Sequence, residues 1–205
     1  MKIPIFQLPF TDEEIAEVQE GIAKVLRSNV LTKGSVAEQF EQEWARYCGT
    51  KYAVACSAGT AALEMIYRAI GVEGKSVIIP SNTFVGTAVG IIRAGGKIIL
   101  ADCEKETLQL SFKSVMGACR EDTVAVVLVH IGGYITPELD LFKSWCKGKG
   151  LWLIEDAAHA HGAEYEGQKA GSLADAAAFS FFPTKVMTCG EGGMVTTDNE
   201  ELYHK

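Results

Sequence analysis

A single lysine, Lys185, follows an aromatic and apolar stretch that reads FSFFPT and precedes a glycine cluster. Lysine is usually a surface residue, so a solvated loop is one interpretation of this position. The neighbouring residues are apolar or small, however, and favour burial of the amine. Burial lowers the pKa of a lysine, and the neutral amine can then condense with an aldehyde. The stretch therefore predicts a nucleophilic lysine.

Asp156 closes an apolar stretch, residues 151–156, where a carboxylate is costly unless a cation or good donors meet it. A helix cap or a surface position would also accommodate it. His159 and His161 follow closely, so a metal-dependent hydrolase that uses these three side chains is another alternative. The two histidines share one side only in extended backbone, and no third ligand has a typical spacing. We therefore expect no metal ion.

Residues 57–63, which read SAGTAAL, form a small-residue turn that opens directly into a helix. Free backbone N–H groups and the positive end of the helix dipole favour a phosphate at such a turn. Gly59 and Thr60 lie at its centre. The alternative is a plain tight turn in which Ser57 or Thr60 caps the helix.

Short apolar runs alternate with helical patterns from residue 52 onward. This pattern is typical of an α/β domain with three layers, α/β/α, around a mostly parallel sheet. In such sheets ligands bind beyond the carboxyl ends of the strands. The predicted strands are residues 52–57, 76–81, 97–102, 123–130, 151–156, 176–182 and 193–197.

Helical patterns flank and connect these strands. Residues 60–71 carry an apolar stripe and end at Gly71, and residues 83–94 form a second helix. Two earlier helices begin with capping-box patterns, Thr11-x-x-Glu14 and Ser35-x-x-Glu38. We predict an N-terminal helical arm over residues 1–50 and a large domain over residues 51–205. A short helix capped by Asp198 or Asn199 ends the sequence, and we expect the chain to be truncated.

The composition excludes several classes of partner. The formal net charge of −7 disfavours nucleic acid and anionic membranes, which require clustered Lys and Arg. The longest apolar runs are too short to span a bilayer. Six cysteines without a C-x-x-C pair indicate reduced thiols in a cytoplasmic protein. They are Cys48, Cys56, Cys103, Cys119, Cys146 and Cys189.

Four of these features have a common explanation. A phosphate-binding turn, the aromatic ring of Phe84, the carboxylate of Asp156 and the amine of Lys185 all follow predicted strands. Together they meet the requirements of pyridoxal 5′-phosphate. The turn anchors the phosphate, Phe84 stacks on the ring, Asp156 keeps the ring nitrogen protonated, and Lys185 holds the aldehyde.

The sequence also resembles a known family. The motifs concerned are spread over nearly the whole chain. They are LTKG at residues 31–34, the stretch from FEQEW to GTAAL, IPSNTFVGTA, EDAAHAHGA, GSLADAAAFSFFPTK and GEGGMVTT. These motifs resemble the DegT/DnrJ/EryC1/StrS family of pyridoxal-phosphate-dependent sugar aminotransferases. The resemblance implies the large domain of the fold type I transferases, with the C-terminal small domain of that fold absent.

The resemblance also implies roles for individual residues. It makes Lys185 the lysine of the internal aldimine and Asp156 the partner of the pyridine nitrogen. It places Gly59, Thr60 and Ser180 at the phosphate and Phe84 on the ring face, and it puts His159 near the cofactor hydroxyl. Retention of Lys185 argues for transamination, because relatives with histidine there are sugar dehydratases.

The resemblance implies transfer of an amino group from an amino acid, with glutamate as the expected donor, to a keto-sugar nucleotide, in an enzyme whose site forms in a homodimer. The alternative is a truncated, catalytically incompetent domain that binds the cofactor or dimerises.

Overall fold

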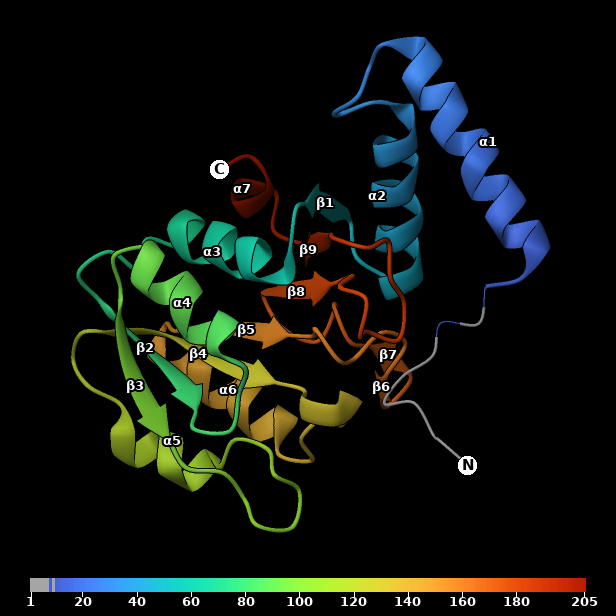
Figure 1. Ribbon diagram of the computed structural model, residues 1–205. Coiled ribbons are helices and arrows are strands. Elements are labelled where there is room, and N and C mark those ends of the chain that lie inside the picture. Colours follow the sequence, from blue (N-terminus) through green and yellow to red (C-terminus); the bar gives the residue numbers. More distant parts are fainter. Residues whose placement is uncertain (1–7, 9) are drawn as a thin grey trace. The chain divides into compact units, whose positions relative to one another are not determined.

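The computed structural model describes residue 8 and residues 10–205 (Figure 1). Residues 1–7 and 9, which belong to the predicted N-terminal arm, lie outside the described residues. Contacts divide the chain into two units, residues 1–40 and 41–205. Helix α2 (Ser35–Cys48) spans this division. The boundary predicted after residue 50 stays a prediction.

The first unit contains helix α1 (Asp12–Ser28) and the start of α2. The capping box predicted at Thr11 is confirmed: the Glu14 amide donates to Thr11 Oγ1 at 3.2 Å, and the Thr11 amide donates to Glu14 Oε2 at 2.8 Å. The box predicted at Ser35 is wrong. The Glu38 amide donates to the Gly34 carbonyl, so Gly34 precedes the first turn of α2.

The second unit is built on a seven-stranded sheet with the order β1-β9-β8-β5-β4-β2-β3. Neighbouring strands from β8 to β3 pair in parallel, whereas β9 is antiparallel to both β8 and β1. Strand β1 therefore runs in the same direction as the parallel strands, and the prediction of a mostly parallel sheet is confirmed. The strands are β1 (Tyr52–Cys56), β2 (Ser76–Pro80), β3 (Lys97–Ala101), β4 (Thr123–Val129), β5 (Trp152–Asp156), β8 (Ala176–Ser180) and β9 (Gly193–Thr197).

Helices cover both faces of the sheet, as the α/β prediction requires (Figure 1). Helices α3 (Gly59–Ala69) and α4 (Val85–Arg93) pack against each other and on one face, together with α7 (Glu200–Tyr203). Helix α5 (Phe112–Ala118) contacts β3, and α6 (Leu139–Lys149) contacts β5. A short 3-10 helix, η1 (Ile131–Gly133), follows β4. No helix among the described residues is long and apolar enough to cross a membrane.

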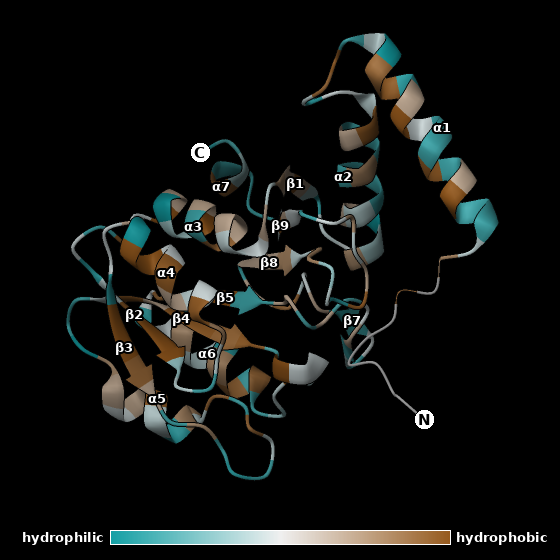
Figure 2. Ribbon diagram, viewed as in Figure 1, coloured by the Kyte–Doolittle hydropathy of each residue, from teal (hydrophilic) through white to brown (hydrophobic). Residues whose placement is uncertain are grey.

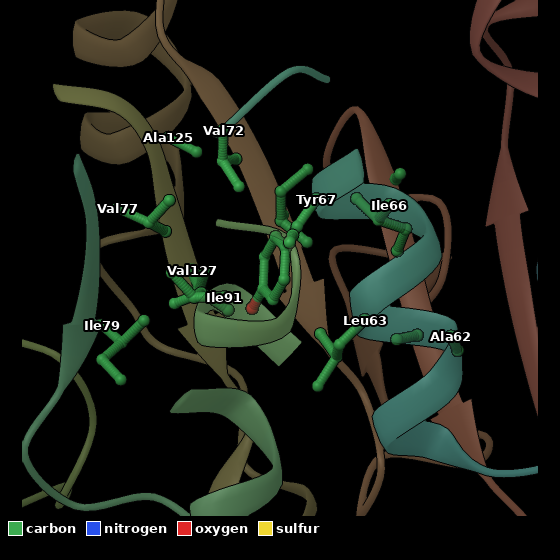
Figure 3. Close-up of a cluster of buried hydrophobic side chains, with 14 of the residues drawn as sticks. Ala62, Leu63, Ile66, Tyr67, Val72, Val77, Ile79, Ile91, Ala125 and Val127 are labelled. Atoms are coloured by element: carbon green, nitrogen blue, oxygen red, sulfur yellow. The ribbon is translucent and has the colours of Figure 1, made fainter. Parts of the chain in front are cut away.

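The core between α3, α4 and the sheet contains the stripe predicted for residues 60–71. Leu63, Ile66 and Tyr67 of α3 are buried and lie beside residues of β2 and β4, as Figure 3 shows. Gly71 follows the helix with a φ of 75°, so it is the predicted C′ glycine. Burial of this apolar stripe fixes α3 on the sheet and thereby fixes the position of its first turn.

A two-stranded hairpin, β6 (Glu164–Tyr165) and β7 (Gln168–Lys169), was not predicted. Its loop is Glu166-Gly167, and both residues have positive φ, 49° and 80°. This geometry is typical of a two-residue type I′ turn. The glycine in the second loop position was therefore a signal for the hairpin.

Strand β5 ends in two carboxylates, and Figure 2 shows its arrowhead in teal, the hydrophilic colour. Glu155 is fully buried. Its carboxylate accepts hydrogen bonds from the amides of Gly171, Leu173 and Ala174 at 2.8 to 3.1 Å, and His130 Nε2 lies 3.0 Å from Glu155 Oε2. These contacts satisfy the buried charge and fix the loop that precedes β8.

Candidate active site

A cavity of about 470 Å³ opens at the carboxyl ends of the strands. Residues that follow β1, β2, β4, β5 and β8 line it, because all five strands run in the same direction. All seven residues predicted for the site line this cavity. They are Gly59, Thr60, Phe84, Asp156, His159, Ser180 and Lys185.

The turn after β1 leads into α3 without a side-chain cap. Its N-cap residue is Ala58, so neither Ser57 nor Thr60 caps the helix as the plain-turn alternative required. The Ala62 amide donates to the Ala58 carbonyl, which leaves the amides of Gly59 and Thr60 without intrahelical partners. This helix end can bind an anion through those amides and the helix dipole.

Two glycines allow close approach around this turn. A methyl group at Gly59 would lie 2.7 Å from Ser180 Cβ, and one at Gly193 would overlap the backbone of Ala58. The absence of both side chains lets β8 and β9 contact the start of α3. Ser180 therefore lies beside the start of α3, where its hydroxyl and the amides of Gly59 and Thr60 could hold an anion together; we call these groups the anion cradle.

The carboxylate of Asp156 lies at the end of β5 and is only 6% exposed. Thr87 Oγ1 donates to Asp156 Oδ2 at 2.7 Å, and the Ala158 amide donates to Oδ1 at 3.2 Å. Among the described residues, no lysine, arginine or histidine forms a salt bridge with it. A buried carboxylate with two donors and no cation is suited to a cationic group of a ligand.

The amine of Lys185 also lines the cavity. Its backbone amide donates to the Phe182 carbonyl at 2.9 Å, which closes a turn just after β8. Burial lowers the pKa of the Lys185 amine, and the negative charge of Asp156 opposes this effect. The neutral, nucleophilic form of Lys185 is therefore present at lower pH than that of an ordinary lysine.

His159 lines the cavity with a defined tautomer. The Gly132 amide donates to His159 Nδ1 at 3.3 Å, so the proton of the neutral ring is on Nε2. Burial lowers the pKa of His159, and the charge of Lys185 adds to this effect while Asp156 opposes it. His159 can thus donate a hydrogen bond from Nε2 without carrying a charge.

Phe84 offers an aromatic face at the cavity. It is the N-cap residue of α4, and its side chain is 68% exposed although it is large and apolar. Exposed aromatic side chains at a cavity are suited to stacking on a planar ligand. Phe84 therefore lines the cavity, and its role on the ring face stays a prediction.

His161 lies away from the cavity. Its Nε2 is 2.9 Å from the Ser180 carbonyl oxygen, and its ring packs among Trp44, Phe179 and Phe181. Burial lowers the pKa of His161 to about 4. No group of three or more His, Cys, Asp or Glu side chains in the described part of the chain could hold a metal ion. The cluster of Asp156, His159 and His161 required by the hydrolase alternative is not formed.

Two threonines at the site were given no role in the prediction from sequence. Thr87 is fully buried and contacts Asp156, and Thr83 Oγ1 lies 2.7 Å from Thr87 Oγ1. Their spacing of four residues at the start of the predicted helix 83–94 places both side chains on one helix face. This spacing was the available signal, but it does not reveal that the face contacts Asp156.

Comparison with known proteins identifies a family. Residues 12–205 match the model of the DegT/DnrJ/EryC1/StrS aminotransferase family. GDP-perosamine synthase from Caulobacter vibrioides is 39% identical over 177 residues, which cover 86% of this chain and 47% of that protein.

Solved structures agree with this match. The aminotransferase from Psychrobacter cryohalolentis has a TM-score of 0.89 and 33% identity, and the alignment covers 98% of this chain and 51% of that one. The PLP form of Spr1654 from Streptococcus pneumoniae has a TM-score of 0.89 and 29% identity, and the alignment covers 100% of this chain and 56% of that one. The chain spans about half the length of the curated relatives it matches.

Proposed function

The chain belongs to the DegT/DnrJ/EryC1/StrS aminotransferase family, and from this premise we propose that it binds pyridoxal 5′-phosphate and transfers an amino group from an amino acid to a keto-sugar nucleotide. The observation that carries the proposal is the placement of Lys185, Asp156 and the anion cradle around one cavity. The amino acid is glutamate in this proposal. The sugar nucleotide is suggested by relatives such as GDP-perosamine synthase.

The residues present fit the cofactor at each of its polar groups. The cradle formed by Gly59, Thr60 and Ser180 accommodates a phosphate, because a Cβ at Gly59 would fill the space beside Ser180. Asp156 offers a buried carboxylate to the protonated ring nitrogen. His159 can donate from Nε2 to the ring hydroxyl oxygen.

Each residue then has a chemical task. When bound, pyridoxal phosphate supplies an aldehyde that condenses with amines and a cationic ring that withdraws electrons. Asp156 keeps the proton on the ring nitrogen, and Phe84 covers the ring face. The Lys185 amine, whose pKa burial lowers, would hold the aldehyde through Nζ until the amino donor displaces it. The same Nζ acts as the base that removes and returns a proton at the substrate carbon.

Covalent trapping at Lys185 tests the proposal. The purified protein is incubated with pyridoxal phosphate, reduced with borohydride and mapped by peptide mass spectrometry. We expect the adduct on Lys185 and its loss in Lys185→Ala, whereas Lys113→Ala on α5, outside the cavity, retains it. Because the pKa of Lys185 is lowered, trapping should persist at pH values where ordinary lysines react poorly. An adduct only on other lysines would refute the assignment.

Amino transfer is measured separately. The holoprotein is incubated with glutamate, and the formation of 2-oxoglutarate is followed. A protein that is trapped at Lys185 but forms no 2-oxoglutarate would match the alternative function of a binding or dimerising domain. Mass spectrometry of candidate keto-sugar nucleotides then identifies the acceptor.

We further propose that the protein is a homodimer in the cytoplasm. Phe182, Val186 and Met187 are exposed apolar residues beside Lys185, and such residues commonly lie in interfaces. All six cysteines are free thiols, which suits a reducing compartment. Light scattering of the purified protein and cell fractionation test the two statements. A monomer at micromolar concentration would contradict the first, and recovery outside the cytoplasmic fraction would contradict the second.

A further inference from the structure

Two threonine hydroxyls and the Asp156 carboxylate form a continuous chain of hydrogen bonds. Thr83 Oγ1 and Thr87 Oγ1 are 2.7 Å apart, and Thr87 Oγ1 is 2.7 Å from Asp156 Oδ2. Thr87 lies in the first turn of α4 and is fully buried. Thr83, Thr87 and Asp156 all line the cavity. The chain therefore links the start of α4 to the end of β5.

The direction of the protons in this chain follows from hydrogen-bond chemistry. An ionised carboxylate only accepts hydrogen bonds, so Thr87 donates its single proton to Asp156. The oxygen of Thr87 then has only lone pairs to offer, and Thr83 must be the donor between the two threonines. The other acceptor near Thr83 Oγ1 is the Phe84 carbonyl at 3.4 Å, which is a longer and weaker contact.

These bonds fix the orientation of the carboxylate. Oδ2 is held by the Thr87 hydroxyl, and Oδ1 is held by the Ala158 amide at 3.2 Å. With one donor on each oxygen, rotation of the Asp156 side chain would break a charge-assisted hydrogen bond. Each oxygen keeps acceptor capacity, and the carboxylate lines the cavity without a salt bridge to any other described residue.

We propose that Thr87 is a positioning residue that aligns the Asp156 carboxylate with the protonated ring nitrogen of the cofactor, and that Thr83 orients the Thr87 hydroxyl. This inference rests on the proposed function. In this proposal Thr87 acts through Asp156. Its effect must therefore depend on the presence of a ring nitrogen.

That dependence gives a direct test by cofactor binding. Dissociation constants are measured for pyridoxal phosphate and for its 1-deaza analogue, in which a C–H group replaces the ring nitrogen. Thr87→Val removes the hydroxyl and keeps the shape, and Thr87→Ser keeps a hydroxyl. We expect Thr87→Val to weaken pyridoxal phosphate binding at least ~10-fold and deaza-analogue binding less than ~2-fold, because hydrogen bonds to charged groups are among the strong ones. Thr87→Ser should restore binding to within ~3-fold.

Thr196→Val is the matched control. Thr196 is also fully buried, and its hydroxyl donates to the Gly171 carbonyl at 2.7 Å, away from Asp156. This variant should change the affinities for both cofactors by the same factor. Thr83→Val, at a partly exposed position, should weaken pyridoxal phosphate binding ~2- to 5-fold with the same dependence on the ring nitrogen. It provides the test if Thr87→Val does not fold.

Equal losses for both cofactors in the threonine variants, or no loss for either, would overturn the inference. The proposed function fails in a different way, since the unmodified protein would then show no pyridoxal phosphate adduct at Lys185. The two failures are therefore distinguishable in the same set of measurements.

Discussion

Replacement of Gly59 by alanine tests the geometry of the anion cradle. The added Cβ would lie 2.7 Å from Ser180 Cβ, 3.2 Å from Ser180 Cα and 3.3 Å from the Phe179 carbonyl oxygen. These atoms belong to β8, which is hydrogen-bonded to β5 on one side and β9 on the other. The strand cannot move away easily, so α3 and β8 must separate at the cradle.

The expected magnitude is a difference between two opposing effects. Overpacking by one methyl group typically costs about 1–3 kcal/mol. Alanine in place of glycine within a helix contributes at most about 1 kcal/mol of stability. With the full propensity gain subtracted, we expect Gly59→Ala to destabilise the fold by up to about 2 kcal/mol. Separation of the free amides from the Ser180 hydroxyl should also weaken pyridoxal phosphate binding by about tenfold, the equivalent of one hydrogen bond to a charged group.

Gly148→Ala is the matched control for this experiment. Gly148 lies within α6, and a Cβ there would meet nothing within 4 Å. The helix-propensity gain then acts alone, so this variant should be more stable by up to about 1 kcal/mol. Urea unfolding and cofactor titration are measured for both variants. If Gly59→Ala is as stable as the unmodified protein and binds the cofactor equally well, the close approach of α3 to β8 does not form the cradle.

Three further substitutions probe the buried polar groups. Tyr67→Phe should leave the unfolding free energy unchanged or raise it by up to about 1 kcal/mol, because the Tyr67 hydroxyl has no hydrogen-bond partner among the described residues. A decrease of the unfolding free energy by more than about 1 kcal/mol in urea unfolding would contradict this. Glu155→Gln should lower the unfolding free energy by about 3 kcal/mol, because the new amide NH₂ group would face backbone donors. The control Glu164→Gln, which breaks the exposed salt bridge to Lys169, should lower it by less than about 1 kcal/mol. Equal decreases in the two variants would refute this comparison. For His161, the unfolded chain takes up a proton below about pH 6.5, and the folded ring does so only near pH 4. The unfolding free energy of the unmodified protein should therefore fall, relative to that of His161→Gln, as the pH decreases from about 7 to 4, and a constant difference would contradict the lowered pKa.

The strands, and the edge of the sheet at which the candidate site lies, were predictable from sequence because their signals are local. Continuous apolar runs such as TVAVVLV at residues 123–129 are typical of strands buried on both faces. Once the strands are assigned, the residues after them must meet at one edge of a parallel sheet. Gly59, Phe84, Asp156 and Lys185 were found in this way.

The features that were missed depend on contacts between distant residues. The run GMVTT predicts a strand but does not encode its direction, and β9 is reversed because it pairs with both β1 and β8. Thr87 meets Asp156 across 69 positions of the sequence. The burial of Glu155 depends similarly on the amides of the loop before β8. Local patterns carry no information about such partners.

The pairing of β1 with β9 has a consequence for the order of folding. The Lys51 amide donates to Asp198 Oδ1 at 2.8 Å across 147 positions of the sequence, and closing so long a loop is entropically costly and slow. The turn after β1 leaves the ribosome early, but Ser180 and Gly193, which complete the cradle around it, are synthesised much later. The proposed phosphate site should therefore appear among the last events of folding, so we expect cofactor binding only after the sheet has closed.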